Sequence, residues 1–155
     1  MDTMFTIFDI ANWFLSKESM THKKLQKLCY YAQAWLYVFE CNKVSTDYEA
    51  WVHGPVNRTL WNRFKSFGYN RIPCNELKNV ATDINDSDVL NVLDSVWETY
   101  GEFTDFELEN LTHTETPWIE AREGCDKFEP SSNLISKSTM KNYYSGLFYQ
   151  EGISE

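Results

Sequence analysis

The chain has 155 residues, a length typical of one domain, and its composition excludes several classes of protein. It carries 14 Lys and Arg against 23 Asp and Glu, a net charge of −9, which repels the phosphate backbone, so direct nucleic-acid binding is not expected. The aromatic content of 16% excludes global disorder. We therefore expect one domain, residues 1–155, built around one hydrophobic core.

Cysteine spacing and hydropathy indicate where the protein resides. There is no CxxC pair and no secretory leader among the first residues, a pattern typical of a reduced intracellular protein. The apolar runs are far shorter than the roughly 18 residues that a membrane-spanning helix needs. The sequence predicts a cytoplasmic protein without membrane association. The cysteines are Cys29, Cys41, Cys74 and Cys125.

Apolar residues at steps of three and four predict two helices in the first quarter of the chain. The first covers residues 5–16, with Thr3 or Thr6 as its N-cap. The second runs from its N-cap Thr21 to Phe39. Its apolar band covers more than half of its circumference, so we expect this helix at the centre of the fold.

Polar residues of the second helix are expected nearer solvent. Lys24 and Lys27 would form one basic patch with Lys23, and Gln33 would also lie outside the apolar band. Asn42 is expected to adopt the left-handed conformation that ends the helix.

The next segment predicts a short strand followed by a helix. Residues 48–52 alternate with a period of two, and Gly54 and Pro55 are expected to end the strand. Pro55 is then expected to begin a third helix that reaches Phe67, because the first helical position tolerates a missing N–H.

The second half of the chain predicts four further helices. The fourth spans residues 86–100 and is closed by Gly101, and the fifth spans 105–112 after the capping box Thr104–Glu107. Thr116 is expected to cap the sixth helix, with Pro117 at its first position. Ser138 is expected to cap a last helix over residues 139–149. Between them, residues 134 and 135 are expected to add an extended pair. We predict a mainly α fold with minor β, a bundle of six to seven helices around the long central helix, with a short strand or hairpin before the His-Gly-Pro turn.

No motif in the sequence supports a catalytic, cofactor or metal site. His22, His53 and His113 lack a second ligand at the spacing that zinc sites use, and glycine-rich phosphate loops, GxSxG and HExxH are absent. We therefore predict a protein that is not an enzyme and needs neither cofactor nor metal. Catalysis would require His53, His113 and Glu115 to converge in one cleft.

The stretch from Trp51 to Arg58 supports two interpretations. In one it is only the end of a strand that enters a helix, with Trp51 in the core and His53 holding the turn. In the other, aromatic side chains at a strand edge form a recognition surface for a polypeptide partner.

Four segments, in this order along the chain, closely resemble the Panacea domain of SocA-like antitoxins and phage-associated GepA-like proteins. The third contains the run Trp-Val-His-Gly-Pro, and the fourth the run Thr-His-Thr-Glu-Thr-Pro-Trp. The chain departs from the family pattern at residues 42–45, where the family commonly has a Gly and a Leu-Phe pair. The matching segments are residues 8–14, 24–35, 48–56 and 111–122.

The resemblance implies a bacterial, plasmid or phage-borne protein that neutralises a cognate protein toxin by direct binding. It also implies a ClpXP-type protease as a further partner, because SocA acts as an adaptor that hands its toxin to such a protease. Members without a recognised toxin leave a second interpretation open, a phage-encoded regulatory or anti-defence protein. The scaffold signature that the resemblance places in this sequence is Leu25, Leu28, Tyr31, Trp35, His113, Pro117 and Trp118.

We predict that the partner binds at the Trp51–Arg58 segment with help from exposed residues of the central helix. The residues expected to contact it are Trp51, His53, Gly54, Pro55, Val56 and Arg58, together with Lys24 and Lys27.

Overall fold

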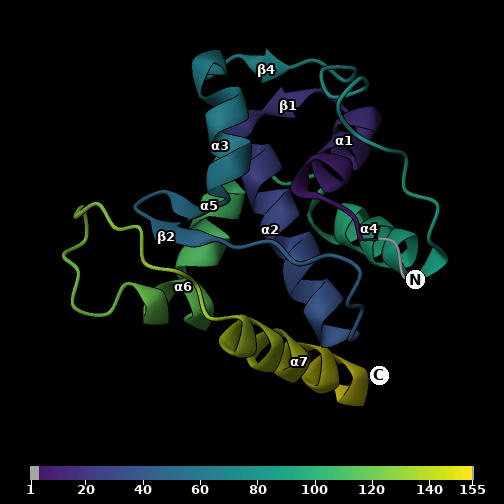
Figure 1. Ribbon diagram of the computed structural model, residues 1–155. Coiled ribbons are helices and arrows are strands. Elements are labelled where there is room, and N and C mark those ends of the chain that lie inside the picture. The colour runs from purple at the N-terminus through teal and green to yellow at the C-terminus, as the bar shows by residue number, and fades with distance from the viewer. Residues whose placement is uncertain (1–3, 155) are drawn as a thin grey trace.

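The computed structural model describes residues 4–154 and confirms the predicted fold class, mainly α with minor β (Figure 1). The described part of the chain contains seven α-helices and two small antiparallel sheets. The helices are α1 (Ile7–Lys17), α2 (His22–Val38), α3 (Arg58–Phe64), α4 (Ser87–Tyr100), α5 (Asp105–His113), α6 (Thr116–Ala121) and α7 (Lys137–Ser154), with a 3₁₀ turn η1 (Lys65–Phe67). The strands are β1 (Met20–Thr21), β2 (Glu49–Trp51), β3 (Gly54–Val56) and β4 (Arg71–Ile72).

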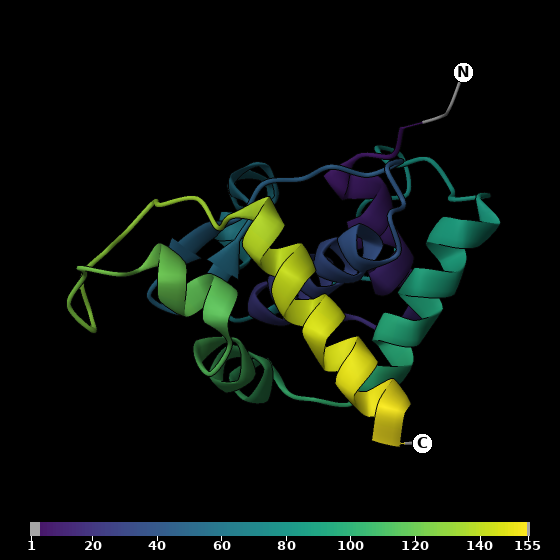
Figure 2. The same cartoon turned by 90° about the horizontal axis from the view of Figure 1, so that it is seen from below.

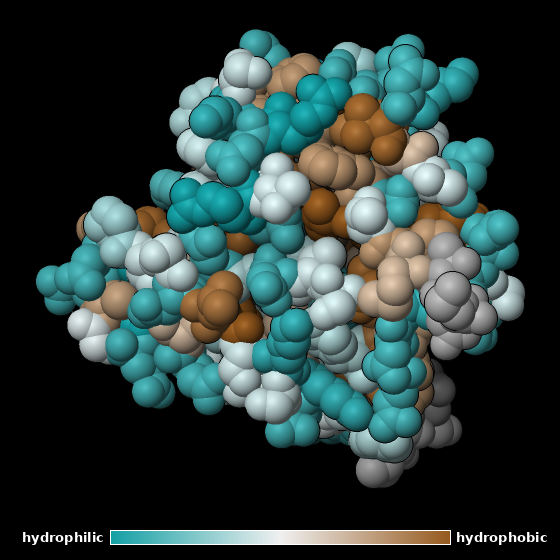
Figure 3. Space-filling view, viewed as in Figure 1, coloured by the Kyte–Doolittle hydropathy of each residue, from teal (hydrophilic) through white to brown (hydrophobic). Residues whose placement is uncertain are grey.

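Helix α2 lies at the centre, as its wide apolar band predicts. Figure 1 shows α1 and α4 on one side of it, α3 and α5 on the other, and α7 across its C-terminal end. Leu25, Leu28 and Tyr31 are fully buried. On the face seen in Figure 3 hydrophilic side chains cover most of this core, with smaller hydrophobic patches between α3 and α1 and beside the segment that leads into α7.

Of the two predicted ends of α2, the N-cap is confirmed and the residue that ends the helix is wrong. Thr21 caps the N-terminus, since its Oγ1 accepts a hydrogen bond from the Lys24 amide at 3.2 Å. At the other end Glu40, not Asn42, adopts the left-handed conformation, with φ of 55°. The Cys41 amide then donates to the Leu36 carbonyl at 2.9 Å, which completes a Schellman motif two residues earlier than expected.

Two polar residues of α2 that were expected near solvent are buried. Lys27 and Gln33 are each only 1% exposed, because neighbouring elements surround α2 on nearly every side. Their polar atoms are satisfied by main chain: Lys27 Nζ donates to the Pro55 carbonyl at 3.2 Å, and Gln33 Nε2 donates to the Val44 carbonyl at 3.1 Å.

Strands β2 and β3 form a hairpin, so the prediction that Pro55 begins a helix is wrong. Pro55 lies opposite Ala50 in the sheet, and the turn consists of Val52 and His53. Helix α3 begins at Arg58 instead, because the Asn57 side chain accepts a hydrogen bond from the Leu60 amide at 2.9 Å and caps it.

A third extended segment borders this hairpin on the β2 side. Glu49 bridges Leu134, and the Ile135 amide donates to the Tyr48 carbonyl at 2.8 Å. The extended pair predicted at 134 and 135 is therefore confirmed.

The remaining boundaries follow local capping where the cap is a side chain within the same turn. The Thr104–Glu107 capping box begins α5 as predicted, and Asp86, at the predicted start of α4, is its N-cap. The predicted caps of α6 and α7 are wrong. Glu115 occupies the N-cap position of α6, which puts Pro117 second, and α7 begins at Lys137, where Ser136 Oγ accepts a hydrogen bond from the Thr139 amide at 3.2 Å.

Candidate functional site

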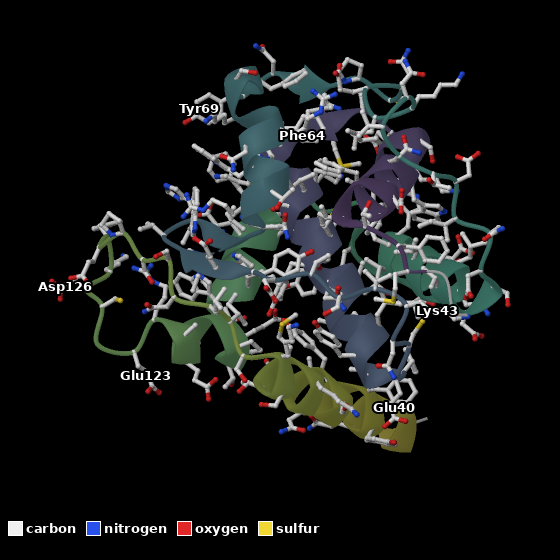
Figure 4. The ribbon with its side chains drawn as sticks, in the orientation of Figure 1. Glu40, Lys43, Phe64, Tyr69, Glu123 and Asp126 are labelled. Atoms are coloured by element: carbon white, nitrogen blue, oxygen red, sulfur yellow. The ribbon has the colours of Figure 1, made fainter. Side chains whose placement is uncertain are left out.

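A groove of about 450 Å³ opens beside the β2–β3 hairpin. One wall is the hairpin and the start of α3, and the other is the loop that follows α6 (Figure 1). Figure 4 shows Glu123 and Asp126 of this loop pointing outward, away from the body of the molecule. We call this depression the hairpin groove, and it is lined by Trp51, Val52, His53, Val56, Arg58, Pro130, Ser131 and Ser132.

The Trp51 side chain of the hairpin groove is held by contacts on several sides. The Arg58 guanidinium lies over the indole, 5.0 Å from the ring centroid, and Trp61 packs against it with centroids 5.3 Å apart. The indole Nε1 donates to Glu49 Oε1 at 2.9 Å, and Arg58 donates two hydrogen bonds to the same carboxylate, at 2.7 and 3.2 Å. These donors, Arg58 first, lower the pKa of Glu49. The half-buried indole is thus fixed before any partner arrives.

Buried side chains of α2 hold the second strand of the hairpin. Lys27 Nζ donates to the Pro55 carbonyl, and Gln26 bonds both main-chain groups of Asn57, accepting from its N–H at 2.8 Å and donating to its carbonyl at 3.2 Å. Burial lowers the pKa of Lys27 to about 7, although the negative charge of Glu109 opposes the shift.

Gly54 is the residue that admits Lys27 beneath the hairpin. Its φ of 108° is a conformation that other residues rarely adopt. A Cβ atom at this position would lie 2.7 Å from Lys27 Cε and 3.1 Å from Thr112 Oγ1. Both the backbone angle and the space therefore require glycine here.

Helix α6 holds the first strand. Trp118 Nε1 donates to the Trp51 carbonyl at 2.8 Å, and His113 stacks on the Trp118 ring with centroids 4.0 Å apart. Arg122, only 7% exposed, donates to the Ala50 carbonyl at 3.0 Å.

Arg122 also fixes the opposite wall of the hairpin groove. Its Nη2 atom donates to the carbonyls of Asp126 and Glu129 at 3.1 and 2.7 Å. One guanidinium thus ties the hairpin to the loop across from it. This role of Arg122 was not predicted from sequence. The sequence feature that points to it is a cation four residues after Trp118, on the same side of α6.

The structure separates the residues that were predicted to contact a partner. Trp51, His53, Val56 and Arg58 line the hairpin groove. Gly54 and Pro55 are buried within β3 and support it from behind, and Lys27 is buried beneath them. Because it is covered on every side, Lys27 contributes no exposed charge.

Lys24 belongs to another part of the surface. Its Nζ donates to the Gly101 carbonyl at 2.7 Å and lies over Trp97, away from the hairpin groove. Lys23 instead pairs with Glu109 at 2.7 Å, and the second carboxylate oxygen of Glu109 meets His53 at 3.1 Å. Despite the burial that opposes it, these two partners lower the pKa of Glu109. The three lysines therefore lie in three different surroundings and do not form the basic patch that was predicted.

The three groups of the acid–base combination considered from sequence have different partners. Glu115 is buried, where it accepts hydrogen bonds from Tyr31 and Tyr144 at 2.7 and 2.8 Å, and its burial raises its pKa. His53 is largely exposed and pairs with Glu109, whereas His113 lies against Trp118. The three side chains thus face different surroundings.

The residues of the scaffold signature lie in or beside the core. Tyr31 stacks on Tyr100 with centroids 4.0 Å apart, and Trp35 Nε1 donates to the Tyr100 hydroxyl at 3.1 Å. Leu25, Leu28 and Pro117 are buried.

In the described residues no group of three or more His, Cys, Asp or Glu could hold a metal ion. None of the described helices has the length and apolar character needed to cross a membrane.

Comparison with known proteins gives one family match, which covers the hairpin but not the facing loop. The family model described as "Antitoxin SocA-like, Panacea domain" matches residues 25–119. The matched segment begins within α2 and ends within α6, so it contains the hairpin together with Lys27, Gln26 and Trp118. Neither the curated proteins nor the solved structures gave a significant match.

Proposed function

Since the chain belongs to the SocA-like antitoxin family with a Panacea domain, we propose that it neutralises a cognate protein toxin by binding it directly. The observation that carries the proposal is the family match over residues 25–119, which includes the whole hairpin and most of the central helix. The protein would act in the cytoplasm of a bacterial or phage-infected cell.

The hairpin groove is the surface that we propose for the toxin. Trp51 offers a large apolar area at its edge, with the Arg58 cation stacked upon it, and Trp and Arg are the residues that most often dominate protein interfaces. The indole and the guanidinium are already held in place, so binding would cost little conformational entropy at these two side chains.

The net charge of the chain also suits this function. At −9 it would attract a basic toxin over long range, which raises the rate of association and disfavours acidic partners. Binding would neutralise the toxin in one of two ways: the complex itself is inactive, or the chain presents the toxin to a ClpXP-type protease.

Co-expression tests the proposal. The open reading frame beside this gene is expressed alone and together with the chain, and bacterial growth is followed. We expect arrest when the neighbour is expressed alone, rescue when the chain is present, and one complex on size-exclusion chromatography. Measuring toxin lifetime with and without the protease then separates inactivation from degradation.

Two arginines of α3 provide a matched pair of variants for the surface. Arg58→Glu places an acid in the hairpin groove beside Glu49, and should weaken the complex at least tenfold and abolish rescue. Arg63→Glu is the control, because Arg63 is also exposed and paired with one glutamate but lies outside the groove. A neighbour that is harmless when expressed alone would refute the antitoxin proposal. Equal effects of the two variants would reject the hairpin groove while leaving neutralisation intact.

A further inference from the structure

A second surface lies at the other end of α2. Phe39, at the C-cap, is 48% exposed, and Phe148 and Tyr149 on α7 are 42% and 67% exposed. The ring centroids of Phe39 and Phe148 are 5.3 Å apart, and those of Phe148 and Tyr149 5.6 Å. We call these three residues the aromatic face. Trp35 supports it from below, with centroid distances of 6.2 and 6.4 Å to the two phenylalanines.

The aromatic face continues into a groove. A depression of about 340 Å³ separates Phe39 and Cys41 from α4, which lines it with Asp88, Asn91, Val92 and Ser95. Figure 2 shows α7 crossing this side of the molecule, with the end of α2 behind it. The apolar ridge and the groove beside it therefore form one surface built from three helices.

The border of this surface is acidic. Asp88 of α4 and Glu40, just after α2, are exposed acids that line the groove, and α4 contains no Lys or Arg. Figure 4 shows Glu40 beside α7, where Lys141 pairs with it at 3.1 Å, and Lys43 toward α4, where it pairs with Asp86. Asp88 lies outside these two pairs and leaves the border with a negative charge.

We propose that the aromatic face and its groove dock a cationic amphipathic helix of a protein partner. The partner's apolar side would cover Phe39 and Phe148 and lie along the groove beside Val92, and a Lys or Arg of the partner would meet Asp88. Helix-in-groove recognition uses such apolar anchors with a charged border.

Charge and backbone pairing select this occupant. A second copy of the chain would bring two acidic α4 helices together in molecules of net charge −9, which is repulsive. An extended peptide would gain no strand pairing, since the strands of the described residues lie in the two small sheets away from Phe39, Phe148 and α4.

The surface is separate from the hairpin groove. Phe39 follows Lys27 by twelve positions, a rise of about 18 Å along the helix. Phe148 and Tyr149 also lie outside the segment that the family model matches. The inference therefore does not depend on the proposed neutralisation of a toxin.

Isotope-edited NMR with designed peptides tests the docking. The probe is a helical peptide with Leu on one side and Lys on the other. One control peptide replaces every Lys with Glu, and another scrambles the order so that no apolar side exists. We expect only the probe to bind, with amide shifts at Phe39, Val92 and Phe148.

Variants of the full chain complete the test. Asp88→Lys, at an exposed position of α4 that lines the groove, and Phe148→Ser should each weaken binding of the probe about tenfold or more. Phe106→Ser is the matched control, since Phe106 is 65% exposed on a different helix. Equal binding of the Glu peptide or of the scrambled peptide would overturn the proposal, as would shifts confined to the hairpin groove. A dimer by sedimentation that Phe148→Ser dissociates would also overturn it, by assigning the surface to a second copy.

Discussion

The hairpin groove and the aromatic face present tryptophan or phenylalanine side chains to solvent, but different forces hold them in place. Around the hairpin groove, buried polar side chains bond main-chain carbonyls: Lys27 to Pro55, Trp118 to Trp51 and Arg122 to Ala50. The aromatic face consists of rings that pack on one another over Trp35.

This difference predicts whether a substitution reduces stability, binding or both. Removing a buried donor leaves a carbonyl unsatisfied, which costs about 1–3 kcal/mol, so changes near the hairpin should reduce both stability and binding. An exposed ring has little to lose on truncation, so changes on the aromatic face should affect binding alone.

Gly54→Ala should have the largest effect. The methyl group would meet Lys27 at 2.7 Å, and alanine would be held at φ of 108°, a strain of about 1–3 kcal/mol before the clash is counted. Urea denaturation should show a loss of more than 2 kcal/mol in unfolding free energy, by the same estimate. Gly146→Ala in α7 is the control, because nothing lies within 4 Å of its Cβ position, and it should be neutral or stabilising. Similar losses in both variants would show that the space at Gly54 is not the cause.

Arg122→Met should cost about 2 kcal/mol, because the Ala50 carbonyl and two carbonyls of the facing loop lose their donor while the methionine still fills the space. Hydrogen exchange should accelerate at the amides of Ala50 and Ile135, which pair the hairpin with the segment before α7. Arg63→Met, at an exposed position, is the control. Unchanged exchange at those two amides would contradict the role given to Arg122.

The pH dependence of stability should report Lys27. Its pKa is about 7 in the folded chain and near 10.5 when unfolded, so between these values the unfolded chain holds a proton that the folded chain has lost. The unfolding free energy should therefore rise by about 2 kcal/mol from about pH 7 to about pH 9, whereas below pH 7 both states are protonated and this group adds no slope. Lys27→Met should remove the rise, whatever its effect on absolute stability. An equal slope in both proteins would assign the rise to another group.

Tyr149→Ser should have the smallest effect on stability, within about 0.5 kcal/mol, because its ring is 67% exposed. Thermal unfolding monitored by circular dichroism measures the change. A loss comparable to that of Arg122→Met would mean that the aromatic face is part of the structural core, and the contrast between the two surfaces would then be wrong.

Much of the fold could be predicted because it depends on residues close in sequence. Thr21 and the Thr104–Glu107 capping box act within three residues, and each begins its helix as predicted. The wide apolar band of α2 likewise predicts its central position from the period of the helix alone. Residues 51–58 were also predicted from sequence as the segment that contacts a partner, and five of them line the hairpin groove.

What only the tertiary structure decided involves partners far apart in the chain. Pro55 lies in a strand rather than a helix because β2 pairs with β3 and because Lys27, 28 residues away, donates to its carbonyl. Glu115 rather than Thr116 occupies the N-cap of α6, and its carboxylate is bonded by Tyr31, 84 residues away. Arg122 acquires its role only when the hairpin, 72 residues earlier, folds against it. Local propensity describes a chain within a few residues, whereas the burial of these polar groups depends on which distant main-chain atoms the packed helices bring to them.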